Sequence, residues 1–360
     1  MSKILVINPG STSTKIALYE EHAQLWQQNI EHDPEKLRQY TVIYDQLSFR
    51  LETVIEAVEA HGNRLEELAC VMSRGGLLPP LSSGAYEVNE AMLDVLEHRP
   101  MNHHASNLGA AIAYRIAQKM GIHAYIYDPV TVDEMIDVVR ITGLKKVRRH
   151  GQGHNLNMRA AAMKYCADYA LRYNAQNLIV AHLGGGITLT LQSQGRIIDM
   201  VSDDEGPFSP ERAGLIPDFK LAKLIDTEKL SYSDTMRMLQ RKGGLTSLLD
   251  TADARKVEER IAQGDAEAKL AYEAMALGVA ESIGRLATVV NGAVDQIILT
   301  GGIAYSKEFT EMIAARVRFI APVTVIPGEN EMQALADGAC RVLSGEEQAK
   351  IYVEPTERPF

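Results

Sequence analysis

Two segments of this chain share one design, in which an apolar strand enters a turn rich in small residues and returns as a second strand. The first covers residues 4–19 and the second residues 177–191, followed by a third strand that ends near Met200. They begin the two halves of a chain of 360 residues. Self-similarity over so long a period indicates a repeated architecture, and the pattern predicts an internal duplication with one hairpin in each half.

The turn of the first hairpin has the composition of a phosphate-binding site. Gly10 lets the backbone bend closely, Ser11 and Ser13 offer hydroxyl and amide donors, Lys15 adds a cation, and Asn8 offers a carbonyl oxygen. The segment is not a P-loop, which needs a second Gly before the Lys and a helix after it. The alternative interpretation is an ordinary hairpin rich in Ser and Thr.

The turn of the second hairpin consists of Gly184, Gly185 and Gly186, and His182 precedes it. Two such hairpins facing each other across a cleft would hold a phosphate from both sides. The expected division is an N-terminal domain of residues 1–150, with the first phosphate hairpin, and a C-terminal domain of residues 151–360, with the second hairpin. The chain is long enough for two hydrophobic cores.

Composition narrows the class of protein. The net charge of −10 argues against nucleic acid or an anionic membrane as the main partner. The three cysteines, Cys70, Cys166 and Cys340, are far apart and lack zinc-site spacing, which favours a reducing cytosol. The N-terminus has no signal-peptide pattern, and no apolar run is long enough to span a membrane. We expect a cytoplasmic protein.

Helical and strand patterns alternate along the chain, which predicts an α/β fold. The long segment 265–291 carries apolar residues at steps of three and four, and these indicate a buried helix face. The other expected helices are 44–61, 89–98, 105–120, 155–173 and one after Gly302, with a helical and loop region at 217–263. The other expected strands are 68–73, 122–128, 296–300 and 323–326.

Three charged residues lie where predicted elements end. Arg74 precedes two glycines, and Arg212 lies in a loop rich in Gly and Pro. Two guanidinium groups can pair with a carboxylate and a phosphoryl group and oppose the repulsion between these anions. Asp128 ends a predicted strand, where it could orient an arginine, act as a base or simply form a turn. The alternative for both arginines is a solvated surface position.

Histidines add further donors. His182 ends the strand that enters the second turn, and His154 follows a loop with two glycines. Because those glycines separate His150 from His154, a metal-binding pair on a helix is not expected there. His103 and His104 precede a helix start, where a capping role and a functional role are both open.

Four motifs in the same order give the chain a family resemblance. They are residues 8–15, 182–186, 206–214 and 300–303, and they span nearly the whole sequence. Together they resemble the acetokinase family and, within it, most closely the butyrate kinases. The resemblance implies a duplicated actin-like ATPase (ribonuclease H-like) fold with two domains around a nucleotide cleft, ATP or ADP in the cleft, and Mg²⁺ on the phosphates.

The resemblance also implies roles for individual residues. His154 takes the place of the first His in the family's Phe-His-Gly segment, although a Gly precedes it here. The implied catalytic residues are Arg74, Asp128, His154, His182 and Arg212. The implied acyl site contains Arg74, His103 and Asn107. The implied nucleotide site contains Asn8, Ser11, Ser13, Lys15, Gly184, Gly185, Gly186, Asp253, Arg255, Gly301, Gly302 and Ile303. The implied metal site contains Asn8 and Glu331.

Two small residues bear on the substrate. Gly76 replaces an aliphatic residue of the acetate kinase pattern, and Ala181 precedes His182. Smaller walls at these two positions would leave room for a longer acyl chain, and each extra buried methylene adds about 0.8 kcal/mol. This chain is also shorter than typical acetate kinases, which is consistent with the butyrate kinases.

The expected function is reversible in-line transfer of the γ-phosphoryl of ATP to butyrate or a related short or branched-chain fatty acid. An acetate or propionate kinase is the alternative. A sugar kinase of the same fold would need a carboxylate base, and a nucleotide-sensing repressor would need a DNA-binding module. The expected partners are a small carboxylic acid and its acyl phosphate, and a homo-oligomer is expected. The preferred acid, the physiological direction and the subunit number stay open.

Overall fold

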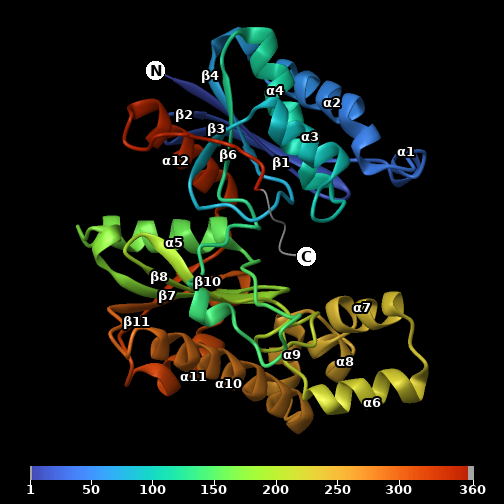
Figure 1. The fold of residues 1–360 in the computed structure, drawn as a ribbon, viewed down its shortest axis with the longest axis vertical. Helices are drawn as coiled ribbons and strands as arrows, with labels where there is room; N and C mark the ends of the chain where they lie inside the picture. Colours follow the sequence, from blue (N-terminus) through green and yellow to red (C-terminus); the bar gives the residue numbers. More distant parts are fainter. Residues whose placement is uncertain (1, 356–360) are drawn as a thin grey trace. The chain divides into compact units, whose positions relative to one another are not determined.

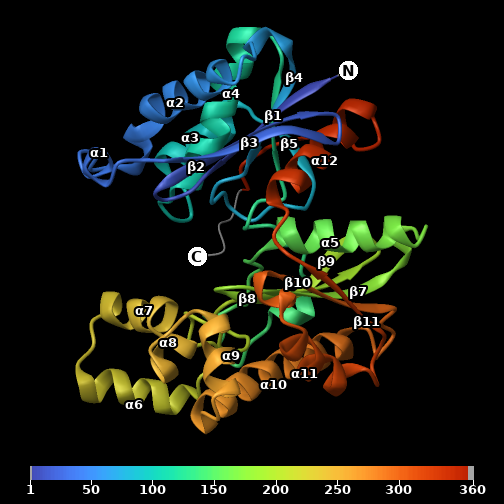
Figure 2. The same ribbon diagram turned by 180° about the vertical axis from the view of Figure 1, so that it is seen from behind.

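The computed structural model describes residues 2–355, which form two compact units (Figures 1 and 2). One unit comprises residues 2–133 and 330–355, and the other Glu134–Glu329. This division differs from the predicted boundary at residue 150. Residues after 133 already join the second sheet, where Ile136 N donates to Ile198 O at 3.0 Å, and helix α12 (Glu331–Ser344) packs on the strands of the first unit.

The first unit is built on a seven-stranded sheet with the order β12-β5-β6-β4-β1-β2-β3. Its first three strands form an antiparallel meander, and β4 and then β6 extend it in parallel on the other side of β1. The strands are β1 (Lys3–Pro9), β2 (Ser13–Glu20), β3 (Ala23–Glu31), β4 (Leu68–Arg74), β5 (Ala85–Glu87), β6 (His123–Tyr127) and β12 (Lys350–Ile351).

The second unit is built on a five-stranded sheet with the order β11-β10-β7-β8-β9. It repeats the pattern of the first, because an antiparallel meander is followed by two strands parallel to its first strand. The strands are β7 (Asn177–Leu183), β8 (Ile187–Ser193), β9 (Arg196–Val201), β10 (Gln296–Gly301) and β11 (Val323–Pro327). The five strands β6-β4-β1-β2-β3 therefore match β11-β10-β7-β8-β9 one for one, and the predicted duplication is confirmed.

Helices cover both faces of each sheet (Figures 1 and 2). In the first unit α2 (Leu47–Ala60), α3 (Glu90–His98) and α4 (Leu108–Met120) share one core with alternate residues of β1, and α12 lies on the other face. In the second unit α10 (Ala266–Val289) and α11 (Lys307–Val317) share a core with β7, and α5 (Asn155–Asp168) lies opposite. Each sheet is thus buried on two sides, as apolar strands require.

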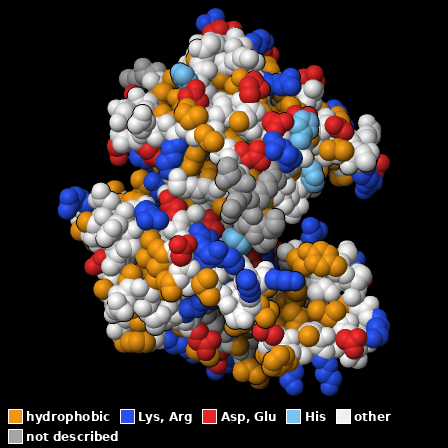
Figure 3. Space-filling view, in the orientation of Figure 1, with side chains coloured by type: hydrophobic (Ala, Val, Ile, Leu, Met, Phe, Trp, Pro, Cys, Tyr) orange, Lys and Arg blue, Asp and Glu red, His pale blue; other side chains and the backbone are white. Residues whose placement is uncertain are grey.

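A group of short helices extends from the second unit: α6 (Asp218–Glu228), α7 (Tyr232–Arg241), α8 (Gly244–Leu249) and α9 (Ala254–Ala262). No residue of α6 is buried. Apolar side chains lie exposed over this region in Figure 3, and Leu215, Phe219 and Tyr232 are among those with high exposure. Among the described residues, no helix combines the length and the apolar character needed to cross a membrane.

Most of the expected elements are present. The helix expected at 265–291 is α10, and Asp265 caps it by accepting the N–H groups of Glu267 and Ala268. The helix expected at 155–173 ends earlier, at Asp168, because Ala170 takes a positive φ of 52°. The sequence did not predict β3 or α12, nor the short α1 (Pro34–Leu37). Strand β3 has a largely exposed, polar sequence, which gives little apolar alternation.

Candidate active site

The first hairpin presents its turn to solvent. Strands β1 and β2 pair as far as Pro9 with Thr14, Gly10 N donates to Ser13 O at 2.8 Å, and Ser11 and Thr12 are exposed. Within residues 2–355, the backbone N–H groups of Ser11 and Thr12 donate to no other group. Exposed N–H groups in a tight turn can bind an anion, which supports the predicted phosphate role.

Asn8, Arg74 and Glu331 meet at the end of this hairpin. The Asn8 Nδ2 donates to Glu331 Oε2 at 2.8 Å, and the Arg74 Nη1 lies 2.9 Å from Glu331 Oε1. Asn8 and Arg74 come together because β1 and β4 are parallel neighbours, whose carboxyl ends lie at the same edge of the sheet. Glu331 begins α12. Three residues predicted separately thus form one cluster.

This cluster fits a magnesium ion that is bound mainly by phosphates. Mg²⁺ in kinases takes one or two protein oxygen ligands, and its other ligands are phosphate oxygens and water. Glu331 supplies a carboxylate, and the Oδ1 of Asn8 is left for a ligand because Nδ2 is the atom that binds Glu331. Among residues 2–355 there is no group of three His, Cys, Asp or Glu side chains suited to a metal ion. The donors suit a shared Mg²⁺ and not an all-protein cage.

His104 lies beside the first turn. The His104 Nε2 is 3.4 Å from Ser11 Oγ, and its Nδ1 accepts the N–H of Ser106 at 3.1 Å. Desolvation and the charges of Arg74 and Arg50 lower the pKa of His104. His103 and His104 are both exposed. The contact gives His104, whose role the sequence leaves open, a place at the turn, and the acyl-site role of His103 stays a prediction.

Gly76 does not widen a pocket. A Cβ atom there would lie 2.6 Å from Asn107 Oδ1 and 2.7 Å from Leu96 Cδ2. Asn107 is buried, accepts the N–H of Leu77 at 2.8 Å and donates to Asn102 O at 2.9 Å. Packed neighbours fill the space that a side chain at this position would occupy. The argument for a longer acyl chain therefore fails at Gly76.

Asp128 follows β6 and is buried. Its backbone has a φ of +38°, and its Oδ1 accepts the N–H of Gly84 at 2.6 Å. A short-side-chain residue such as Asp tolerates this left-handed region better than most. One carboxylate oxygen therefore holds the loop at Gly84.

The second hairpin brings His182 and Arg212 to its glycine turn. His182 is 1% exposed and pairs with Thr188 across the hairpin. A Cβ atom on Gly184 would lie 2.9 Å from His182 Nε2, and one on Gly186 would lie 2.6 Å from Arg212 Nη1. The glycines are thus needed for His182 and Arg212 to approach the turn closely.

The ring of His182 is held on three sides. The Asn157 Nδ2 lies 3.0 Å from its Nδ1, the Glu329 Oε1 lies 3.2 Å from its Nε2, and the ring of His154 stacks on it at 3.9 Å between centroids. The His154 Nδ1 in turn lies 3.0 Å from Thr188 Oγ1. Because an amide nitrogen only donates, Nδ1 of His182 accepts and Nε2 carries the proton.

Arg212 is anchored by its own loop. Its backbone N–H donates to Ser209 Oγ at 3.2 Å, and Ser209 Oγ donates to the backbone oxygen of Gly185 at 2.6 Å. Its guanidinium pairs with Asp203, and desolvation lowers its pKa. The alternative of a solvated surface arginine does not hold, because Arg212 packs directly on the glycine turn.

Ala181 lies in the core of the second unit. It is 0% exposed and shares the apolar cluster of Ile179 and Leu183. Successive side chains on a strand point to opposite faces, so Ala181 on β7 points away from the face of His182. The second argument for a longer acyl chain therefore fails as well.

The nucleotide residues predicted farther along the chain divide into two groups. Asp253 caps α9, accepting the N–H of Arg255 at 3.0 Å, and pairs with its guanidinium. Both contacts are within three consecutive residues.

Gly301 has a φ of +92°, and a Cβ atom there would lie 2.4 Å from Leu183 O, so this glycine packs on the second hairpin. Gly302 and Ile303 follow in the short helix Gly302–Tyr305.

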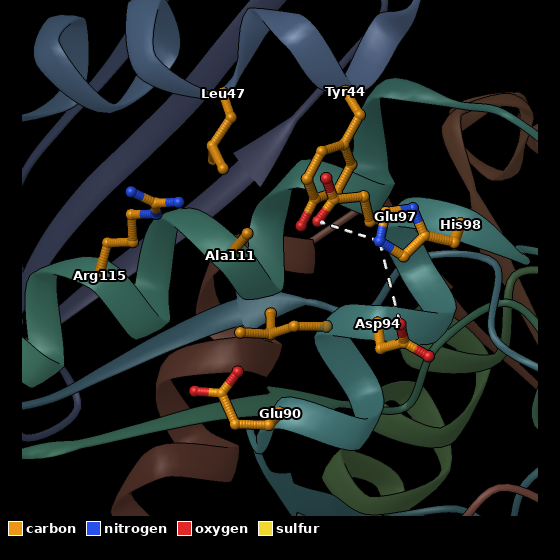
Figure 4. Close-up of a pocket in the computed structure, with 9 residues that line it drawn as sticks. Tyr44, Leu47, Glu90, Asp94, Glu97, His98, Ala111 and Arg115 are labelled. Carbon is orange, nitrogen blue, oxygen red and sulfur yellow. Dashed lines mark ion pairs between the residues drawn. The ribbon is translucent and has the colours of Figure 1, made fainter.

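A separate pocket in the first unit contains none of the predicted site residues (Figure 4). Tyr44 and Leu47 line one side, and residues of α3 and α4 line the others. His98 forms ion pairs with Asp94 at 3.9 Å and Glu97 at 4.0 Å. Burial raises the pKa of Tyr44 to about 12. The three carboxylates of Glu90, Asp94 and Glu97 outnumber the single arginine, Arg115, so this pocket does not suit an anionic phosphoryl group.

Sequence reasoning missed three residues that contact the two hairpins, and it left the role of His104 open. The three residues are Arg50, Asn157 and Glu329. Asn157 is one turn into α5, on the face toward β7, and its helical spacing from His154 could have indicated a shared face. No local pattern marks Arg50, which lies on α2 and contacts the first turn through tertiary packing.

Comparison with known proteins identifies the relatives of the chain. A family model described as "Acetokinase family" matches residues 91–358. The chain is 46% identical over 353 residues to a "Probable butyrate kinase 2" of Caldanaerobacter subterraneus subsp. tengcongensis, covering 98% of this chain and 100% of the relative.

Solved structures show the same fold. An acetate kinase of Porphyromonas gingivalis matches with a TM-score of 0.80 and 20% identity, covering 95% of this chain and all of that one. A propionate kinase of Francisella tularensis subsp. tularensis SCHU S4 matches with a TM-score of 0.74 and 19% identity, covering 94% of this chain and 99% of that one. With the repeated sheets, these matches confirm the duplicated actin-like ATPase fold, and the chain belongs to the acetokinase family of carboxylate kinases.

Proposed function

We propose that this protein is a butyrate kinase, which transfers the γ-phosphoryl group of ATP to the carboxylate of butyrate or a closely related acid, giving an acyl phosphate and ADP. The reaction is reversible, because an acyl phosphate and ATP are both high-energy phosphates. The observation that supports phosphoryl transfer most directly is the meeting of His182 and Arg212 at the glycine turn of the second hairpin, where each needs a glycine to approach.

The residues of the second unit are assigned to the phosphoryl group. His182 donates from Nε2, and Arg212 adds a delocalised positive charge, so both oppose the charge on the equatorial oxygens of the transferring group. The stack of His154 on His182 keeps the ring from turning. Glu329 leaves Nε2 when an anionic phosphoryl oxygen takes its place.

The residues of the first unit are assigned to the acid and the nucleotide phosphates. A carboxylate is ionised at neutral pH and attacks without a general base, so catalysis consists of positioning and charge neutralisation. Arg74 holds the carboxylate, and the turn with Ser11, Ser13 and Lys15 holds phosphate. When bound, Mg²⁺ neutralises phosphate charge, and Asn8 and Glu331 are the residues that would hold it.

The choice of butyrate is supported by the similarity to a relative that bears this name. It has no support from Gly76 or Ala181, since packed neighbours surround both. The proposed preference for butyrate therefore rests on the similarity to a butyrate kinase and not on Gly76 or Ala181. We also propose that the reaction depends on Mg²⁺ and that the protein is located in the cytoplasm.

A substrate panel tests the proposal. The protein is incubated with Mg·ATP and acetate, propionate, butyrate, isobutyrate, valerate or glucose, and acyl phosphate is trapped with hydroxylamine while ADP is measured. We expect the highest kcat/KM with a four-carbon acid. If kcat/KM is highest with acetate or propionate, the proposed acid is wrong, but the proposed reaction, phosphoryl transfer to a carboxylate, stands. ADP formation with glucose and no trapped hydroxamate would reject a carboxylate kinase.

A further inference from the structure

Arg50 on α2 is completely buried behind the turn of the first hairpin. Its Nη1 donates to Gly10 O at 2.9 Å and to Ser13 O at 3.0 Å, and its Nη2 donates to Ser11 O at 3.1 Å. One guanidinium group thus binds three backbone carbonyls within four residues. A fork of fixed donors of this kind holds a turn in one conformation.

The remaining contacts of Arg50 are with uncharged groups. Nε donates to Gln46 Oε1 at 3.0 Å, and Nη1 also lies 3.1 Å from Thr14 Oγ1. Thr14 Oγ1 lies 2.8 Å from His32 Nε2, and burial and the charge of Arg50 lower the pKa of His32 to about 4, so His32 is neutral. In the described part of the chain, no carboxylate pairs with Arg50.

A buried charge without a counter-ion is costly. Burial lowers the pKa of Arg50 to about 10, which still leaves the guanidinium protonated at neutral pH. The folded protein therefore keeps one net positive charge directly beneath the turn. Purely structural packing would be served better by an apolar side chain or by a neutralised pair.

The orientation of the peptide groups in the turn leaves their N–H groups on the side away from Arg50, where an anion can bind. In a trans peptide the C=O and N–H groups point in opposite directions, and the described residues contain no cis peptide. Since the carbonyls of Gly10 and Ser11 point at Arg50, the N–H groups of Ser11 and Thr12 point away from it. These are the N–H groups that donate to no other group within residues 2–355.

We propose that Arg50 is a positioning residue for the phosphate turn of residues 10–13, which it fixes and makes electropositive for the polyphosphate of a nucleotide. It acts through the backbone and does not touch the ligand. This inference rests on the proposed function, because it takes the bound anion to be the phosphates of ATP or ADP.

The sharpest test is Gln46→Glu. This change keeps the shape of the side chain and places a carboxylate beside the Nε of Arg50, at the N-cap position of α2. The pair neutralises the buried charge, and a negative group at a helix N-terminus is favourable. We expect a folding stability equal to or above wild type, a Kd for ATP raised about tenfold, and a Kd for adenosine unchanged. Gln118→Glu, on the exposed side of α4, is the matched control for one added negative charge.

Two further variants separate charge from geometry. Arg50→Met removes the charge and the hydrogen bonds, and we expect it to weaken ATP binding by more than tenfold with adenosine unaffected. Arg50→Lys keeps the charge and loses the fork, and we expect an intermediate loss. If Arg50→Met does not fold, Gln46→Glu and Arg50→Lys decide the question. Binding is measured by calorimetry at two salt concentrations.

The outcomes distinguish the inference from the proposed function. Folded Gln46→Glu that binds ATP as tightly as wild type would overturn the role of Arg50 and leave the kinase assignment intact. Equal losses for ATP and adenosine would also overturn it, because they indicate a merely structural residue. Wild-type protein that binds no ATP would overturn both.

Discussion

The Nε2 atom of His182 lies 3.2 Å from the Oε1 atom of Glu329, so a buried imidazole and a half-exposed carboxylate meet at the second glycine turn. The opposite ring nitrogen accepts from Asn157. The ring therefore presents a donor on the side of the turn, where the proposed reaction needs one for a phosphoryl oxygen.

Asn157→Asp is expected to lower kcat about ten- to a hundredfold. An aspartate accepts where the amide donates, so it moves the proton of His182 from Nε2 to Nδ1 and removes the donor. Turnover is measured against pH, and the tautomer by nitrogen NMR of labelled histidine. Asn157→Leu, which removes the constraint without reversing it, is expected to lose less. Equal turnover of Asn157→Asp and wild type would contradict the assignment.

Arg212→Ala is expected to lower kcat by about three orders of magnitude, as losses of phosphoryl-charge contacts do in other kinases. The measurement is steady-state turnover of protein whose circular dichroism matches wild type. Arg237→Ala is the control, because Arg237 is an exposed arginine of the same unit that pairs with Asp234. Near-normal turnover of folded Arg212→Ala would remove this residue from the site.

Gly186→Ala is expected to reproduce part of that loss without removing any charge. The added Cβ would lie 2.6 Å from Arg212 Nη1 and must displace the guanidinium. We expect kcat to fall by at least tenfold. Gly284→Ala, within α10 and with no atom near its added Cβ, is the control and should stabilise the helix by about 0.5–1 kcal/mol. Unchanged kcat in Gly186→Ala would show that Arg212 is not held at this turn.

His32 is expected to make folding sensitive to acid. Burial and the charges of Arg50 and Lys36 lower its pKa to about 4 in the folded state, from an ordinary value near 6.5. The neutral form is favoured by folding, so its contribution is complete above pH 6.5 and is lost as the pH falls toward 4. His32→Gln should show a smaller drop in urea midpoint between pH 7.5 and 5 than wild type. His98→Gln, at an exposed position, should match wild type, and a drop in His32→Gln equal to that of wild type would contradict the assignment.

The sequence was a good guide to residues at the ends of strands. Asn8 and Arg74 end neighbouring parallel strands, so strand pairing alone brings them together. The two glycine turns follow from apolar strands and small residues, which are local signals. The family resemblance added Glu331, and the structure places it between Asn8 and Arg74.

Other residues could not be predicted because tertiary packing decides them. The choice between His103 and His104 depends on the course of one loop, and the space beside Gly76 depends on Leu96 and Asn107. Arg50 reaches the first turn from a helix that begins more than thirty residues later. Ala181 is different, because strand alternation alone was enough to separate it from His182.

The late return of the chain to its first sheet affects how the protein folds during synthesis. Helix α12 covers one face of that sheet, and strand β12 completes its edge beside β5. The apolar side chains of Ile4 and Val6, fully buried in the finished fold, belong to a sheet whose partners leave the ribosome last. The nascent first unit thus exposes an apolar surface until α12 and β12 have been synthesised, whereas the second unit, continuous from Glu134 to Glu329, can fold earlier.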